Sequence, residues 1–374
     1  MEDLLARLVA MPTISSDIAA NDAALDYIES YLVERGLHSK RYRFDGHGSL
    51  VATTRSHRKN PLVLLAAHVD VMYGSEKVFA LREKNGKLFG RGTYDMKFAI
   101  AAYMQLIDNL RDHINDYDIG VMITSDEEMG GRDNINGTRR LIIEDEYQPG
   151  MAILPDGGTD YKIESIAKGH WRFDLIAKGR TAHGGRPWEG ESASFKLIEA
   201  LRDLKQYFKD HGPLTDTLNI GFIRGGEAYN QIPDNMSAAV EIRLMDDTRL
   251  PSHRAMVDTI CSTHEVTYQT KIIHLPTVNN IAAPLAQAFM ASLERVRGEK
   301  VDTCISFGSS DGYYFALKDI PCIVTRPIGG GLHSEEEWAD RDSFLQLLPI
   351  LEDYVEHVAK VPAVTPVDIK TPVV

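Results

Sequence analysis

Most of the chain alternates short apolar runs with stretches of helical periodicity. Residues 23–35 place apolar side chains at helical spacing and end before Gly36, and residues 97–110 form a second helical segment. Short apolar runs typical of buried strands lie at residues 61–67, 118–124, 151–154 and 322–325. Buried strands that alternate with helices predict a mostly parallel sheet flanked by helices.

The pattern changes between residues 168 and 275. There the periodicity predicts, in order, a strand, a helix, two strands, a helix and a strand, at residues 170–179, 192–208, 217–225, 235–244, 252–263 and 266–275. The order β-α-β-β-α-β is that of a ferredoxin-like domain. We therefore predict an α/β protein in which a discontinuous domain, residues 1–167 and 276–374, contains an inserted domain, residues 168–275.

Length, composition and charge narrow the possible functions. The 374 residues suit two to three domains at about 150 residues each. Apolar residues make up 43% of the chain and charged residues 25%, which is typical of a globular protein with a sizeable core. Lys and Arg number 41 against 54 Asp and Glu, so the net charge of −13 repels nucleic acid and anionic membranes. We expect neither as a partner.

The cysteines and the N-terminal sequence bear on location. Cys261, Cys304 and Cys322 are too few and too scattered for a disulfide framework or a thiolate zinc site. The opening MEDLLARLVAMPTISS is acidic and lacks the basic stretch and apolar run of a secretory signal. We therefore expect a reducing, cytoplasmic location.

Residues of the types that bind metal ions follow four of the predicted strands. These residues are His68 and Asp70, then Glu127 and Glu128, then Asp156, and finally His333, which comes after a glycine-rich turn. The carboxyl ends of the strands of an open α/β sheet share one edge, where ligands gather. Their common topology indicates a metal site at that edge.

Sequence spacing suggests separate roles for neighbouring residues. His68 and Asp70 are two apart and point to one side of an extended chain, so the carboxylate can hold one imidazole nitrogen while the other faces a metal. Glu127 and Glu128 diverge because they are adjacent, which fits one base and one ligand. Asp95 lies just before the helix at 97–110, where it is either a ligand or a helix cap.

A series of motifs covers nearly the whole chain. In order they are AAHVDV, GRGTYDMKFAIAA, TSDEEMGG, LPDGG, AKGRTAHGGRP, GGEAYNQIPDNMSAAVEIR, SFGSSDGYYFA and GGGLHSEEEW. This series resembles the zinc amidohydrolases that include acetylornithine deacetylase, succinyl-diaminopimelate desuccinylase, aminoacylase, carboxypeptidase G and carnosinase-like dipeptidases. The resemblance implies hydrolysis of the amide bond of a small N-acyl amino acid, of the deacetylase or desuccinylase type.

The same resemblance implies two zinc ions per chain, with cobalt or manganese as possible substitutes. His68 and Asp156 would bind one ion, Glu128 and His333 the other, and Asp95 would bridge them. The family also suggests that the peptide bond after Asp95 is cis. A hydroxide bridging the two ions would attack the substrate carbonyl.

Further roles follow from the resemblance and from neighbouring residues. Glu127 would be the general base, and Asp70 would orient His68. His183, in the inserted domain, would reach the active site of the partner subunit in a homodimer and stabilise the oxyanion; the alternative is a flexible surface histidine. Substrate-binding roles fall to Asn230, Arg243, Gly308 and Ser309.

Alternatives remain at this stage. Asp156 replaces the Glu of many deacylases and is commoner among the dipeptidases, so a metallo-dipeptidase or carboxypeptidase acting on short peptides is an alternative function. A non-catalytic binding protein on this scaffold is a remote one, because Glu127 and the ligands are all present. We also expect residues 335–337 to form a solvated turn and His253 to lie at the surface.

Overall fold

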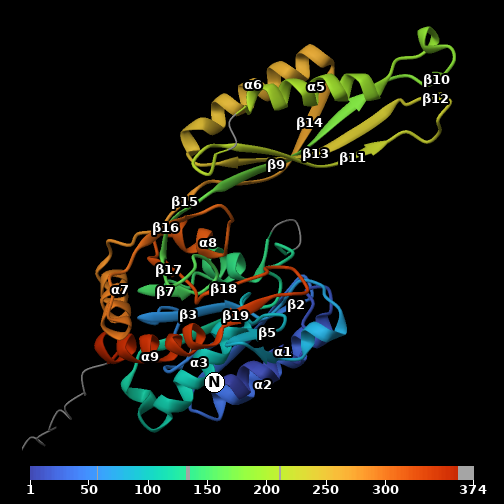
Figure 1. The fold of residues 1–374 in the computed structure, drawn as a ribbon. Helices are drawn as coiled ribbons and strands as arrows, with labels where there is room; N and C mark the ends of the chain where they lie inside the picture. The colour runs from blue at the N-terminus through green and yellow to red at the C-terminus, as the bar shows by residue number, and fades with distance from the viewer. Residues whose placement is uncertain (57, 132–134, 210–211, 361–374) are drawn as a thin grey trace, which may run out of the picture. The chain divides into compact units, whose positions relative to one another are not determined.

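The computed structural model describes residues 1–56, 58–131, 135–209 and 212–360 (Figure 1). Its helices are α1 (Glu2–Val9), α2 (Ile18–Val33), α3 (Lys97–Leu110), α4 (Gly137–Arg139), α5 (Ala193–Tyr207), α6 (Leu250–His264), α7 (Pro284–Arg297), α8 (Gly312–Ala316) and α9 (Arg341–Val358). Short helical turns are η1 (Glu76–Phe79), η2 (Arg111–Asp116), η3 (Arg140–Glu144), η4 (Pro187–Glu189) and η5 (Asp247–Arg249).

Within the described residues the strands form five sheets. They are β1 (His38–Phe44), β2 (His47–Thr53), β3 (Val63–His68), β4 (Arg82–Lys84), β5 (Lys87–Phe89), β6 (Ile119–Thr124), β7 (Met151–Leu154), β8 (Ile163–Ala167), β9 (Gly169–Lys178), β10 (Ala182–His183), β11 (Thr217–Gly225), β12 (Gln231–Ile232), β13 (Asn235–Leu244), β14 (Val266–His274), β15 (Thr277–Val278), β16 (Thr303–Ser306), β17 (Cys322–Val324), β18 (Gly329–Gly330) and β19 (Trp338–Asp340).

The largest sheet has the strand order β1-β2-β6-β3-β7-β17. Strands β6, β3, β7 and β17 are parallel, which confirms the predicted mostly parallel α/β sheet, and β2 and β1 extend it as an antiparallel edge. Every residue of β3 and β6 is buried, because helices cover both faces of the sheet. Figure 1 shows α3 and α9 on one side of this sheet and α8 on the other.

The described chain divides into two compact units. Unit 1 comprises Met1–Ser165, Asn279–Cys304 and the described residues from Ser310 onward, and unit 2 comprises Ile166–Val278 and Ile305–Ser309. The strands at the boundaries form a three-stranded sheet of order β15-β8-β16. Unit 1 contains the parallel sheet and the larger apolar core.

Unit 2 has a four-stranded antiparallel sheet of order β11-β13-β9-β14, with α5 and α6 on one face (Figure 1). This is the predicted ferredoxin-like arrangement. Its core contains Trp171, Phe173 and Val240. The expectation for His253 was wrong: it is 4% exposed, and its Nε2 lies 2.8 Å from Asp216 Oδ2, so this histidine is part of the interior.

Among the residues that the structure describes, no helix combines the length and apolar character needed to cross a membrane.

Candidate metal centre

The ends of the parallel strands place the candidate ligands of unit 1. His68 is the last residue of β3 and pairs with Thr124, the last residue of β6, so the loop containing Glu127 and Glu128 starts beside His68. Asp156 follows β7 by two residues. Because the strands run in the same direction, these side chains meet at one edge of the sheet.

The first group of candidate ligands is His68, Asp95 and Asp156. The Nε2 atom of His68 lies 3.3 Å from Asp95 Oδ1 and 4.0 Å from Asp156 Oδ1. His68 is 1% exposed, so bulk water does not separate these groups. The spacing suits a cation between the three side chains.

The second group is Asp95, Glu128 and His333. The Nε2 atom of His333 lies 3.0 Å from Glu128 Oε2 and 3.3 Å from Asp95 Oδ2. Asp95 therefore presents one oxygen to each histidine. The peptide bond between Asp95 and Met96 is cis, the isomer suggested by the resemblance.

The chemistry of the donor set fits divalent cations. The Nε2 atom of His68 is buried and has no hydrogen-bond partner, although buried imidazole nitrogens are normally paired. Burial raises the pKa of Glu127, Glu128 and Asp156, and neighbouring carboxylates raise it further. Bound cations would neutralise this concentration of negative charge, and imidazole with carboxylate is a typical ligand set for zinc.

The histidines respond to the same charges. Burial alone would lower the pKa of His68, but the carboxylates of Asp70 and Asp95 outweigh it and raise the pKa well above its ordinary value. Asp95 and Glu128 raise the pKa of His333 to about 10. Raised pKa values mean that the imidazole rings hold an additional proton when no metal is bound. A metal bound at either Nε2 would have to displace that proton, so metal binding should release protons.

Asp70 organises the site through more contacts than its spacing from His68 suggests. The Nδ1 atom of His68 is 3.0 Å from the backbone oxygen of Asp70 and 3.5 Å from its carboxylate. That carboxylate accepts hydrogen bonds from the backbone N–H groups of Glu127 and Glu128 and from the hydroxyl of Ser15. Asp70 thus fixes both the histidine and the loop with the two glutamates. No pattern in the sequence pointed to Ser15.

The two adjacent glutamates face different partners. Glu127 Oε2 lies 3.9 Å from His68 Nε2, whereas Glu128 approaches His333. Burial raises the pKa of Glu127 well above its ordinary value, and Asp156, Asp311 and Glu128 act in the same direction. A raised carboxyl pKa suits a group that has to take up and release a proton near neutral pH.

The expectation that residues 335–337 form a solvated turn fails at Glu337. Glu337 is 2% exposed, and its Oε1 accepts hydrogen bonds from the backbone N–H groups of Gly92, Tyr94 and Asp95. Its Oε2 accepts a hydrogen bond from Arg91. The correction has a physical reason: a buried carboxylate is tolerated where donors surround it. Glu337 is therefore part of the structure around Asp95.

Five predicted site residues belong to unit 2. His183 is exposed on β10, which pairs with β12, and the backbone N–H of Gly185 donates to its Nδ1. The N–H of Gly184 donates to the oxygen of Asn230, so His183 and Asn230 lie on adjoining segments. On β13, Arg243 Nε is 2.6 Å from Glu241 Oε1. Gly308 and Ser309 are exposed.

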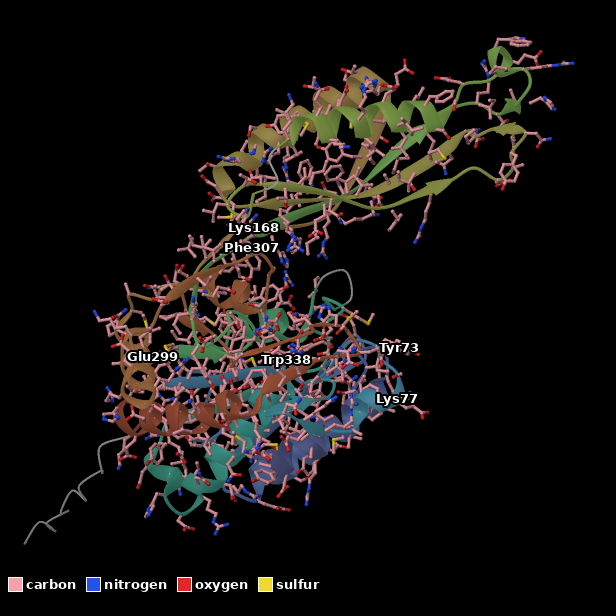
Figure 2. All side chains as sticks on the ribbon, viewed as in Figure 1. Tyr73, Lys77, Lys168, Glu299, Phe307 and Trp338 are labelled. Carbon is pink, nitrogen blue, oxygen red and sulfur yellow. The ribbon has the colours of Figure 1, made fainter. Side chains whose placement is uncertain are left out.

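One further cation of unit 2 was not predicted. The Lys168 ammonium lies 5.4 Å from the centroid of the Phe307 ring, and Figure 2 shows the two residues together. Its Nζ donates to the backbone oxygen of Thr215, and burial lowers its pKa. Lys168 thus brings a positive charge to the segment that contains Gly308.

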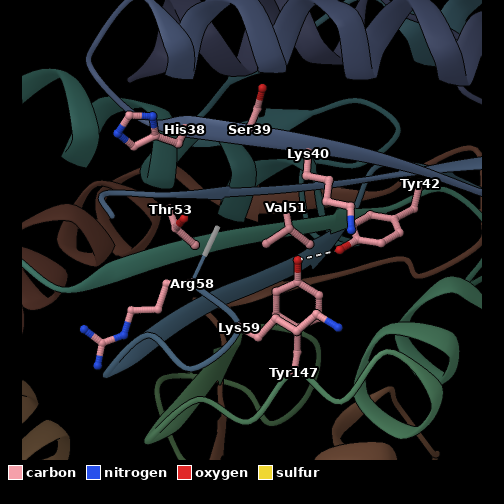
Figure 3. A pocket seen from close by; sticks show the side chains of 9 residues that line it. All are labelled: His38, Ser39, Lys40, Tyr42, Val51, Thr53, Arg58, Lys59 and Tyr147. Atoms are coloured by element: carbon pink, nitrogen blue, oxygen red, sulfur yellow. Dashed lines mark hydrogen bonds between the residues drawn. The ribbon is translucent and has the colours of Figure 1, made fainter. Parts of the chain in front are cut away.

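Unit 1 also has a pocket of about 170 Å³ outside the candidate metal centre (Figure 3). Its lining residues are His38, Ser39, Lys40, Tyr42, Val51, Thr53, Arg58, Lys59 and Tyr147. Arg58 pairs with Asp118 at 3.0 Å, and Lys59 donates to the backbone oxygen of Asp145. Two of the cations are therefore engaged in the fold, and the pocket contains none of the predicted ligands.

Comparison with known proteins identifies related sequences. The family model described as peptidase family M20/M25/M40 matches residues 64–357. Succinyl-diaminopimelate desuccinylase of Hahella chejuensis is 27% identical over 319 residues, which are 79% of this chain and 82% of that protein. A probable carboxypeptidase of Ajellomyces dermatitidis is 32% identical over 210 residues, but this match covers 50% of the chain and 47% of that protein.

Solved structures with the same fold include two peptidases. A tripeptidase from Staphylococcus aureus gives a TM-score of 0.79 at 21% identity, over 96% of this chain and 98% of that one. An M20 family metallo-carboxypeptidase from Sulfolobus solfataricus gives 0.77 at 15% identity, over 94% and 97%. At these identities the likeness establishes the fold.

Proposed function

The chain belongs to peptidase family M20/M25/M40 and is a metal-dependent amide hydrolase, and from this premise we propose that it uses two zinc ions to hydrolyse a small N-acyl amino acid. The observation that carries the two-ion proposal is the carboxylate of Asp95, which lies 3.3 Å from His68 through one oxygen and 3.3 Å from His333 through the other. Two-metal hydrolases hold their ions about 3.5–4 Å apart, a distance that one carboxylate can bridge.

The candidate ligands and the candidate base of unit 1 each have a defined role in this proposal. His68 and Asp156 would hold one ion, Glu128 and His333 the other, and Asp95 both. Bound zinc ions supply Lewis acidity, which polarises the scissile carbonyl and acidifies water. Glu127 accepts the proton of the attacking water and passes it to the leaving amine. No covalent bond between enzyme and substrate is required.

The residues of unit 2 complete the proposal on the substrate side. Arg243 and Asn230 would bind the carboxylate of the amino acid, since a guanidinium and an amide both donate hydrogen bonds to it. Glu241 already neutralises part of the charge of Arg243. Gly308 and Ser309 would contact the substrate, and His183 would donate a hydrogen bond to the developing oxyanion.

The first prediction concerns metal content. Metal-free protein titrated with zinc should bind two ions per chain, and proton release should accompany binding because His333 has a pKa of about 10. Elemental analysis after gel filtration gives the stoichiometry, and calorimetry in two buffers gives the protons. Cobalt and manganese should occupy the same sites. A saturated stoichiometry of one ion or none would contradict the two-metal centre.

The second prediction separates the candidate substrate classes. We expect zinc-loaded protein to cleave N-succinyl or N-acetyl amino acids faster than dipeptides or C-terminally extended peptides, because the relative matched over most of its length is a desuccinylase. The likeness to a probable carboxypeptidase favours the alternative, a peptidase acting on short peptides. A screen of both classes that follows amine release decides between them. Zinc-loaded protein inactive on every compound would favour a binding protein.

A further inference from the structure

We propose that Glu337 is a positioning residue that holds Asp95 in place relative to His333. It thereby determines the zinc affinity of the site formed by Asp95, Glu128 and His333. The inference rests on the proposed two-metal function and adds a residue to it. Glu337 itself does not face the candidate ions: both of its oxygens are occupied by N–H donors of unit 1. Its effect has to pass through the backbone of Asp95.

The first argument is the number of backbone donors on one oxygen atom. Oε1 of Glu337 lies 2.9 Å from the nitrogens of Gly92 and Tyr94 and 3.1 Å from that of Asp95. Three converging N–H groups fix the path of the chain immediately before the Asp95 side chain. A carboxylate is the strongest acceptor available for this purpose, because bonds to an ionised group are about twice as strong as neutral ones.

The second argument is the position of Glu337 in the chain. It follows His333 by four residues, and its own backbone oxygen accepts a hydrogen bond from Gly90. The next residue, Trp338, pairs with Phe89 on β5 and with Gly330 on β18. Glu337 therefore joins the segment that holds His333 to the loop that holds Asp95. The distance between two ligands of one ion depends on this connection.

The third argument concerns Arg91, whose side chain is buried with that of Glu337. Arg91 Nη1 lies 3.0 Å from Glu337 Oε2, and its Nη2 donates to the backbone oxygen of Tyr73. Burying two charges gives little net stability, because desolvation offsets their attraction. A buried pair that also fixes a ligand loop is better explained by the geometry it imposes. Arg91 keeps the second oxygen of Glu337 occupied.

Glu337→Gln tests the proposal directly. The side-chain amide presents one acceptor oxygen instead of two, so either Arg91 or the three N–H groups lose their partner. We expect one of the two zinc dissociation constants to rise about 10–100-fold, the usual effect of removing a residue that orients a metal ligand. The other dissociation constant should change less. Competition with a chromophoric chelator, using the full-length protein, measures both constants without an activity assay.

Asp216→Asn is the matched control. Asp216 is also a buried carboxylate that accepts a backbone hydrogen bond, from Met245, and contacts His253, but it lies in unit 2. This variant should lower the unfolding temperature of the metal-free protein and leave both zinc dissociation constants within about twofold. A general loss of stability is thereby distinguished from a specific loss of metal affinity.

A second variant covers the case in which Glu337→Gln does not fold. Glu337→Asp keeps the charge opposite Arg91 but is one methylene shorter, so its oxygen cannot reach all three N–H groups. We expect a folded protein with the same selective weakening of one zinc ion. Unchanged dissociation constants in a folded Glu337 variant would overturn the inference while the two-metal function stands. Wild-type protein that binds no second ion would overturn the two-metal proposal itself.

Discussion

Glu127→Gln is expected to lower kcat by about 10²–10⁴-fold, the usual contribution of general acid–base catalysis, while both zinc ions remain bound. The amide is nearly the same shape as the carboxylate but cannot take a proton from water. Glu127 Oε2 lies 3.9 Å from His68 Nε2, and Glu127 belongs to neither of the two groups of candidate ligands, so its loss should leave the ligand geometry intact. Steady-state kinetics on metal-loaded protein, together with metal analysis, measures the two effects separately.

Glu336→Gln provides the control for this variant. Glu336 is an exposed glutamate in the segment after His333, so the substitution makes the same chemical change near the site without touching a predicted ligand. Its kcat should equal that of the wild type. Near-normal turnover of a metal-loaded Glu127→Gln protein would remove Glu127 from the mechanism, whereas loss of zinc from it would show that Glu127 is a ligand.

Local sequence pattern was sufficient for the elements that position the metal centre. The runs at 97–110 and 151–154 coincide with α3 and β7. Continuous apolar strands reveal where a parallel sheet ends, and a polar residue at that end is then recognised as a candidate, as at His68, the last residue of β3. The antiparallel edge strand β1 was not predicted because its sequence, HSKRYRF, is mostly polar and lacks an apolar run. In the structure its residues are exposed or half-buried.

Contacts between distant segments account for what the sequence did not reveal. Glu335, Glu336 and Glu337 are three identical residues in a row, so the sequence does not distinguish between them. Only the fold brings the backbone N–H groups of residues 92, 94 and 95 to Glu337. Ile305–Ser309 joins unit 2 although it is far from that unit in sequence, and its periodicity offers no reason to assign it there. Ser15 likewise meets Asp70 across 55 residues. Such roles depend on tertiary structure that local periodicity does not encode.

His183→Ala is expected to lower kcat by about 10²–10³-fold, the usual cost of removing one oxyanion donor, and to leave the zinc content unchanged. Amide hydrolysis places negative charge on the carbonyl oxygen in the transition state. His183 is exposed and its Nδ1 accepts a hydrogen bond from Gly185, so its Nε2 carries the proton in the neutral ring and is available as a donor. Kinetics and metal analysis on the same sample test both parts.

Mixing two inactive variants tests whether His183 acts across a dimer. We propose a homodimer, the commonest closed assembly, in which each chain supplies His183 to its partner. A chain with His183→Ala keeps its base, and a chain with Glu127→Gln keeps its histidine. Each mixed dimer then has one active site with an intact base and a histidine from the other chain, so activity should partly return.

The outcome depends on subunit exchange, which differently tagged chains and affinity capture verify. If exchange is demonstrated and activity stays absent, the histidine acts within its own chain or has no role in catalysis. A further variant tests whether His183 acts as a hydrogen-bond donor. His183→Gln keeps a side-chain N–H donor at this exposed position, and partial recovery relative to His183→Ala would retain the donor role, whereas equal loss in both would show that the imidazole itself is required.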